Sequence, residues 1–225
     1  MDGQIWIFIV VAIVIIVAGI FSSIAAKKRR EAMAVLAAKL GLNFTTTHDT
    51  IIATRFGFLD RLGKGDNRYA YNILSGNYRG NDVLAFDYHY QTYSTDSKGR
   101  RQTHHHHFSC FICNLPMEFP EVTIGKESIF SKIAQGFGYD DIDFESAEFS
   151  EKFCVRSKDK KFAYDVCNAQ MIEYLLANPD LNIEIEGTAL ALGFGSCLAA
   201  SEIESNLERL VKIRSLLPNY LFKKA

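Results

Sequence analysis

Residues 5–26 read IWIFIVVAIVIIVAGIFSSIAA, and this stretch decides how the rest of the chain is organised. The run contains no charged side chain. As an α-helix it would extend over roughly 33 Å, enough to cross a hydrocarbon core about 30 Å thick. The residues that follow it directly are all basic: Lys27, Lys28, Arg29 and Arg30. The sequence therefore predicts a transmembrane anchor over residues 1–26 and a basic juxtamembrane helix over residues 27–41.

The charges around this run indicate its orientation. The leader Met-Asp-Gly-Gln carries no basic residue, and the apolar run is longer than the 7–15 residues typical of a cleaved signal peptide. Basic residues stay on the cytoplasmic side of a membrane. We therefore expect the N-terminus outside and residues 42–225 as a cytoplasmic domain, at a bacterial inner membrane. The basic tetrad is either a topology signal alone or also a contact for anionic lipid headgroups, worth about 1 kcal/mol per charge.

Composition limits what the domain can be. The chain has 225 residues, and without the anchor it has the length of one medium domain. Beyond Arg30 there are 21 Lys and Arg against 25 Asp and Glu, so no nucleic-acid partner is expected. The five cysteines show no dense spacing and are expected to be buried thiols in a cytoplasmic domain.

Three β-rich runs give the clearest strand signal: residues 69–78, 83–93 and 102–115. Turn residues separate them, so antiparallel hairpins are expected. Alternation places Leu84, Phe86, Tyr88 and Tyr90 on one face of the middle run, which is expected to pack on the core. The second turn, residues 96–99, adjoins three cations that would form an exposed basic finger: Lys98, Arg100 and Arg101.

The second half of the chain mixes helices and strands. Short strands are expected at residues 43–47, 121–124 and 152–157, and a hairpin at 182–186 and 189–194 across Gly187-Thr188. Apolar residues at helical spacing predict a short helix over residues 128–136 and two longer ones over 161–178 and 201–217. This pattern predicts an α+β domain with antiparallel hairpins and two longer helices.

An acidic segment contains Asp141, Asp143 and Glu145 at the spacing of the first calcium ligands in an EF-hand loop. The match fails at Ser146, where glycine is required, and at Lys152, where a glutamate is required. Apolar residues alternate with these acids, so the segment is predicted to be an edge strand with a solvated face, available to a partner.

Metal chemistry is the one catalytic or sensing alternative that the residues suggest. Alternation places His104 and His106 on one face of the third run. If the second and third runs pair antiparallel so that the numbers of facing residues sum to about 195, His89 lies opposite His106. His89, His104 and His106 could then hold zinc or iron. A shift of one residue would change which histidines join His89. No HExxH, GxSxG or paired CxxC pattern supports this site or a nucleophilic one, so no catalytic residue is assigned.

Several short motifs carry a resemblance: FDYxY (86–90), STDSKGRRxT (94–103), FxVxS (153–157), FAYDV (162–166) and IEG (185–187). With these motifs and its anchor, the chain resembles a family of uncharacterised bacterial single-pass membrane-anchored proteins. The resemblance spans nearly the whole chain but implies no activity or catalytic residue. Members of that family often carry a Thr-rich segment with one His at residues 104–107, which implies no essential multi-histidine site.

Two functional hypotheses follow. The first is a non-enzymatic, membrane-tethered cytoplasmic module that binds a protein partner or a membrane surface. Its candidate contacts are the basic finger, the acidic segment and the basic tetrad. The alternative is a metal sensor or metal-dependent enzyme that uses the histidine-rich strand.

Overall fold

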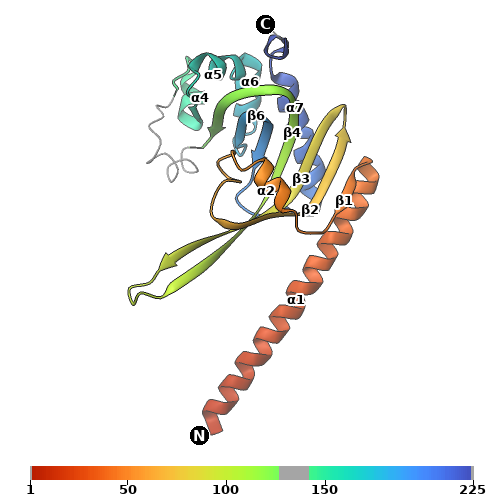
Figure 1. The fold of residues 1–225 in the computed structure, drawn as a ribbon, viewed down its shortest axis with the longest axis vertical. Helices are drawn as coiled ribbons and strands as arrows, with labels where there is room; N and C mark the ends of the chain where they lie inside the picture. Colours follow the sequence, from red (N-terminus) through yellow and green to blue (C-terminus); the bar gives the residue numbers. More distant parts are fainter. Residues whose placement is uncertain (1, 127–141, 224–225) are drawn as a thin grey trace.

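The computed structural model describes residues 2–126 and 142–223 (Figure 1). A long N-terminal helix, α1 (Asp2–Leu40), precedes a six-stranded antiparallel sheet, and the helix α7 (Ala200–Leu216) packs on that sheet near the end of the chain. The predicted α+β fold class is confirmed.

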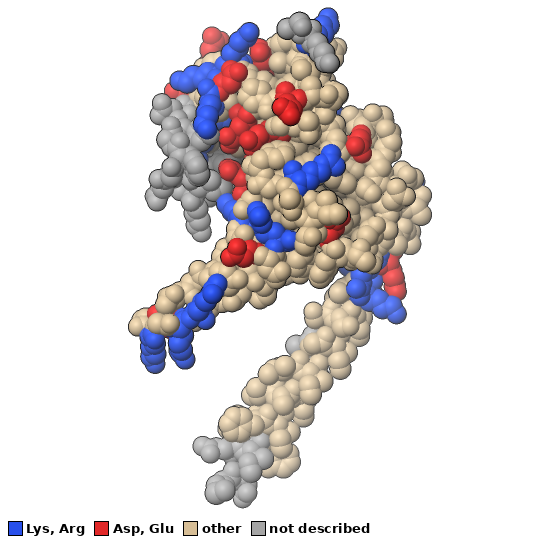
Figure 2. Space-filling view, viewed as in Figure 1, with Lys and Arg blue, Asp and Glu red and all other residues tan. Residues whose placement is uncertain are grey.

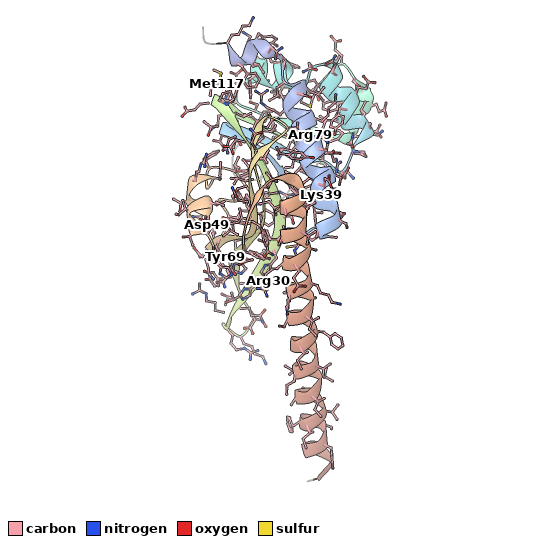
Figure 3. All side chains as sticks on the ribbon, turned by 90° about the vertical axis from the view of Figure 1, so that its right-hand side faces the viewer. Arg30, Lys39, Asp49, Tyr69, Arg79 and Met117 are labelled. Atoms are coloured by element: carbon pink, nitrogen blue, oxygen red, sulfur yellow. The ribbon has the colours of Figure 1, made fainter. Side chains whose placement is uncertain are left out.

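Helix α1 has two parts with different surroundings. Its N-terminal part projects away from the domain, and its most apolar window has a mean hydropathy of 3.1 with none of it buried. Its C-terminal part lies beside α7 and buries Met33 and Ala37 (Figure 3). Gly41, at φ +68°, ends the helix in the left-handed conformation expected of a C-terminal cap. Among the described residues, α1 is the one helix long and apolar enough to cross a membrane, a property that suits an anchor and also a signal sequence.

The sheet is built around one long bent strand. Its members are β1 (Asn43–Thr45), β2 (Asp66–Tyr78), β3 (Asn81–Thr95), β4 (Arg101–Gly125), β5 (Cys154–Arg156) and β6 (Ile183–Gly193). The order is β1-β2-β3-β4-β5, and β6 also pairs with β4. Strand β4 therefore pairs with β3 along its first half and with β6 and β5 along its second. The strand predicted at residues 121–124 is the end of β4 and not a separate element.

Both faces of the sheet are covered, so the domain has two apolar clusters. Phe86 and Tyr88 of β3 lie in the smaller cluster beneath α2 (Thr50–Arg55) and the loop that follows it. Val83 and Ala85, on the opposite face of β3, lie in the larger cluster with α1 and α7. The aromatic face of β3 packs on a core as predicted, and the alternate face is buried as well.

The single helix predicted over residues 161–178 is two helices, α5 (Lys160–Val166) and α6 (Ala169–Ala177). The helix is interrupted at Cys167 and Asn168. The Asn168 side chain accepts hydrogen bonds from the backbone N–H groups of Gln170 and Met171. Asparagine competes with the helix backbone in this way, which makes it a favoured N-cap. The prediction was wrong because the apolar spacing continues across the break.

The predicted hairpin at residues 182–194 is one continuous strand, β6. Gly187 has φ +53°, which is typical of a turn, but here it lies opposite Phe119 at a register shift between β4 and β6. A left-handed glycine produces a bulge in a strand as readily as a reversal. The Gly-Thr pair therefore bends β6 and does not reverse it.

The predicted acidic edge strand is also wrong. Residues 142–146 form no strand, and Ser146 caps the helix α4 (Ala147–Lys152) by accepting from the Phe149 N–H. Asp141 and the helix predicted at 128–136 lie outside the described residues. The 201–217 helix is α7, one residue earlier at each end, and is followed by the short 3-10 helix η2 (Asn219–Phe222).

Candidate functional site

The β3–β4 hairpin extends beyond the rest of the sheet. Pairing of β2 with β3 reaches only Gln91, and pairing of β6 with β4 begins at Cys110. Residues 92–107 therefore form a two-stranded arm. The arm projects from the same side of the domain as the apolar part of α1 (Figure 1), and Lys and Arg side chains gather at its tip (Figure 2).

The turn at the tip is held by Asp96. Its side chain accepts from the backbone N–H groups of Lys98 and Arg100 and, at 2.9 Å, from Arg100 Nε. The Arg100 N–H is the largest cause of the lowered pKa of Asp96. Arg101 lies 3.6 Å above the ring of Tyr93. The finger cations Lys98, Arg100 and Arg101 are all exposed at this tip.

This turn corrects the expected strand register. Thr95 pairs with Arg101, so five residues, 96–100, form the loop instead of the four that were expected. The extra residue moves the partner of His89 from His106 to His107. His104 and His106 lie opposite Thr92 and Tyr90, on the other face of the arm. The set His89, His104 and His106 is therefore not brought together.

The histidines on the face of His89 form an aromatic cluster. His89 is buried and stacks on Tyr69, with ring centroids 4.5 Å apart. Its Nδ1 lies 3.0 Å from the carbonyl oxygen of Asn67, so Nδ1–H is the donor, and Nε2 lies 3.0 Å from His105 Nδ1. Burial is the main cause of the lowered pKa of both His89 and His107. Ring stacking and hydrogen bonds between the imidazoles account for this arrangement.

In the part of the chain that the structure describes, no group of three or more His, Cys, Asp or Glu side chains is arranged to hold a metal ion. The zinc or iron hypothesis stays a prediction from sequence that this geometry does not strengthen.

A buried polar network surrounds Asp87, which lies on β3 and is 1% exposed. Its carboxylate accepts from Arg29 Nε at 3.0 Å and Arg29 NH2 at 2.8 Å, a bidentate ion pair. Asn72 Nδ2 and Ser109 Oγ donate to the same carboxylate at 2.9 and 2.8 Å. Arg29 also donates to the Leu198 carbonyl. One residue of α1 is thereby joined to strands β2, β3 and β4 and to the segment before α7.

Arg29 therefore does not share the surroundings of the rest of the basic tetrad. Its side chain is 21% exposed, whereas Lys27, Lys28 and Arg30 are exposed. Burial disfavours the charged guanidinium, but the hydrogen bonds and charge of Asp87 outweigh that effect and raise the pKa of Arg29. Sequence reasoning missed this pair, although Arg29, Met33 and Ala37 recur every four residues and so share one helix face.

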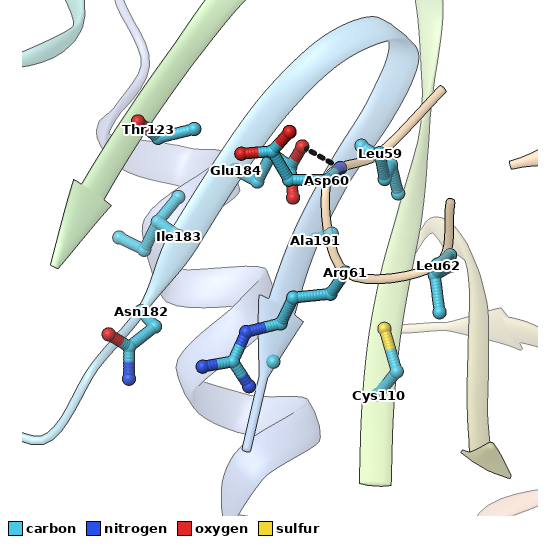
Figure 4. A pocket seen from close by; sticks show the side chains of 11 residues that line it. Leu59, Asp60, Arg61, Leu62, Cys110, Thr123, Asn182, Ile183, Glu184 and Ala191 are labelled. Carbon is cyan, nitrogen blue, oxygen red and sulfur yellow. Dashed lines mark hydrogen bonds between the residues drawn. The ribbon is translucent and has the colours of Figure 1, made fainter. Parts of the chain in front are cut away.

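A second polar feature lies beneath the loop after α2 (Figure 4). A cavity there is lined by apolar residues together with Arg61, Glu184 and Asn182. The Asp60 N–H donates to Glu184 Oε1 at 2.6 Å, and burial raises the pKa of Glu184 to about 8. Asn182 Oδ1 is buried and has no hydrogen-bond partner among the residues that the structure describes. The cavity volume of about 30 Å³ suits one or two water molecules, too little for an organic ligand.

All five cysteines are free thiols, and Cys110, Cys113, Cys154 and Cys167 are buried. Cys110 and Cys113 face opposite sides of β4 and belong to different apolar clusters, as alternation predicts. Burial raises the pKa of Cys110 to about 12 and that of Cys113 to about 11. These thiols therefore remain protonated near neutral pH and pack as small apolar side chains.

Comparison with known proteins identifies the fold. No protein-family model matches the sequence, and no curated protein matches it. Among solved structures, the chain is similar to mycobacterial trehalose monomycolate transport factor A, TtfA. The TM-score is 0.54 at 12% sequence identity, and the similarity covers 85% of this chain and 95% of that of TtfA. At this identity the likeness shows a shared fold and no more. The resemblance to a family of uncharacterised anchored proteins stays a prediction.

Proposed function

We propose that this chain is a single-pass membrane protein whose cytoplasmic domain acts without catalysis at the bilayer surface, where its basic finger contacts anionic lipid headgroups. The observation that carries the proposal is that α1 and the arm leave the domain on the same side (Figures 1 and 2). A helix that crosses the bilayer would bring the arm to the headgroup layer, and the finger presents three exposed cations there.

The exposed members of the basic tetrad support the same reading. Lys27, Lys28 and Arg30 follow the apolar run directly and would lie at the cytoplasmic headgroups. In Figure 1 the apolar part of α1 and the arm both run toward the lower left at different angles, so both can meet one bilayer if α1 crosses with a tilt, as membrane helices commonly do. TtfA is named as a transport factor for a glycolipid, trehalose monomycolate. By analogy in fold, we assign this chain an accessory role in moving a membrane lipid, in contact with a protein partner.

The test measures whether the tip reaches the bilayer. An environment-sensitive fluorophore is attached at Ser97→Cys in a Cys197→Ser background, and the full chain is reconstituted in nanodiscs. We expect a blue-shifted emission in discs containing phosphatidylglycerol and a smaller shift in phosphatidylcholine alone. Reversing the finger charges (Lys98→Glu, Arg100→Glu, Arg101→Glu) should abolish the difference.

A label at Lys223→Cys is the matched control, because the C-terminus lies at the opposite end of the molecule (Figure 1). Its emission should not depend on the lipid. Identical spectra at the two labelled positions in both lipids would contradict a lipid contact for the finger and would direct the search to a protein partner.

A further inference from the structure

A polar groove lies at the root of the arm, on the sheet face opposite α1. It is lined by the loop after α2, the paired strands of the arm root and the end of β6: Arg61, Lys64, Tyr90, His106, Phe108 and Phe194. Its volume is about 400 Å³, within the range of small-molecule sites and far larger than the cavity of Figure 4.

Two cations line this groove without an ion pair to any described carboxylate. Arg61 NH1 donates to the Phe194 carbonyl at 2.7 Å, and its guanidinium points away from Asp60 and Glu184 (Figure 4). Burial lowers the pKa of both Arg61 and Lys64, although the charge of Asp60 partly offsets this for Lys64. A half-buried cation that lacks an ion pair is costly, and an anionic ligand would reduce that cost.

Close packing fixes the loop that carries these cations. A Cβ at Gly193 would lie 2.7 Å from Arg61 Cδ, so the arginine stem crosses the strand where no side chain intervenes. A Cβ at Gly65 would lie 2.2 Å from the Gln91 carbonyl oxygen and 2.8 Å from the Tyr90 ring. Both glycines permit approaches that no other residue allows: Gly193 lets the Arg61 stem lie against β6, and Gly65 lets the backbone next to Lys64 lie against Tyr90 and Gln91 of β3.

The remaining wall supplies a phenol and an imidazole. Tyr90 stacks on His106 with ring centroids 4.5 Å apart and planes 13° from parallel. Burial raises the pKa of Tyr90, so its phenol stays protonated and can donate a hydrogen bond. The His106 ring is held by Thr92, whose Oγ1 lies 2.8 Å from Nε2.

We propose that this groove binds a phosphate group, with Arg61 and Lys64 as its cationic contacts and Tyr90 as a neutral donor. A guanidinium, an ammonium and a phenol match the three peripheral oxygens of a phosphate ester better than the two of a carboxylate. The site shares no residue with the basic finger and does not depend on the finger reaching the membrane. The phosphate belongs either to a lipid headgroup or to a soluble phosphate ester.

The test is site-resolved acetylation of Lys64, measured by mass spectrometry on the full chain in phosphatidylcholine nanodiscs. Saturating sn-glycerol 3-phosphate, or phosphatidic acid in the discs, should slow acetylation of Lys64 at least five-fold. Exposed Lys160 is the internal control and should react at an unchanged rate. Arg61→Gln should remove the protection, and Arg61→Lys should restore part of it.

The outcomes separate the sources. Protection by both compounds assigns recognition to the phosphate group itself, and protection by phosphatidic acid alone assigns it to a lipid. Protection that persists when the finger is neutralised (Lys98→Gln, Arg100→Gln, Arg101→Gln) distinguishes the groove from the proposed membrane contact. No protection by either compound, or equal protection by acetate, would overturn the proposal.

Discussion

At the scale of single residues, a largely buried ion pair joins α1 to the sheet. Asp87 is 1% exposed and is satisfied by Arg29, Asn72 and Ser109 together. Two of these partners are neutral, so Arg29 supplies the entire counter-charge. A carboxylate left buried without one costs several kcal/mol.

Arg29→Ala should lower the free energy of unfolding by about 3 kcal/mol or more, because it leaves Asp87 buried and uncompensated. Urea unfolding in detergent micelles, followed by near-ultraviolet circular dichroism, measures the loss. Lys28→Ala, one position away and exposed, should change stability by less than about 0.5 kcal/mol. Arg29→Ala combined with Asp87→Asn should recover part of the loss; if it recovers nothing, the buried charge is not the cause.

Glu184 gives the domain a specific dependence on pH. Its pKa rises from 4.5 to about 8 on folding, so the folded state retains a proton that the unfolded state loses. The contribution of protonated Glu184 to the free energy of unfolding is fully present below about pH 4.5. It is lost as pH rises through 8, by up to about 1.4 kcal/mol per pH unit. Glu184→Gln should therefore make the urea midpoint of unfolding less dependent on pH between pH 5 and 8. Exposed Glu118→Gln should leave the slope of the parent; equal slopes in all three proteins would contradict the assignment.

At the scale of elements, periodicity predicted most strands and helices, and local geometry decided the rest. The three β-rich runs and α7 follow from alternation and from helical spacing. The break at Asn168 and the bulge at Gly187 depend on which backbone groups a side chain or a neighbouring strand can reach. The spacing of apolar residues in the sequence does not predict those contacts. The register of the arm depends on whether Arg100 belongs to the loop. Because it does, each histidine lies on the face of the arm opposite to the one expected relative to His89.

Asn168→Ala should destabilise the domain by about 1–2 kcal/mol. The change removes the cap at the start of α6 and the hydrogen bond from Asn168 Nδ2 to the Leu216 carbonyl at the end of α7, at 2.9 Å. Thermal unfolding of the full chain in micelles measures it. Asn219→Ala is the control, because that side chain is exposed and should contribute less than about 0.5 kcal/mol. Similar losses in the two variants would argue against the cap.

At the scale of the whole molecule, the helix that follows the apolar run is docked on the domain. Residues 27–41 are predicted as a juxtamembrane helix, and within them Met33 and Ala37 are buried in the core while Arg29 pairs with buried Asp87. The sequence could locate the apolar run from composition alone. It could not show that the helix beyond it docks, because the docking partner, Asp87, is distant in sequence.

Two truncations test this docking. A chain of residues 22–225 keeps Arg29 within a helix that Ser22 can cap, and a chain of residues 31–225 lacks it. We expect the shorter chain to be less stable by about 3 kcal/mol or more, and to yield less soluble protein. Equal urea midpoints for the two chains would show that the domain folds independently of its anchor.

Because α1 is one continuous helix, it affects the strength of the proposed contact between the domain and the bilayer. A flexible tether would let the domain occupy a volume that grows with tether length. Each weak contact with lipid would then have to offset the entropy lost when the domain is held at the bilayer. Here the helix continues from the apolar run into the core, and Arg29 fixes it to the sheet. In the proposed membrane contact, the basic finger would thus be presented at a high effective concentration of headgroups, so a few cations of modest individual affinity would suffice. The same rigidity would restrict the domain to partners that come to the membrane.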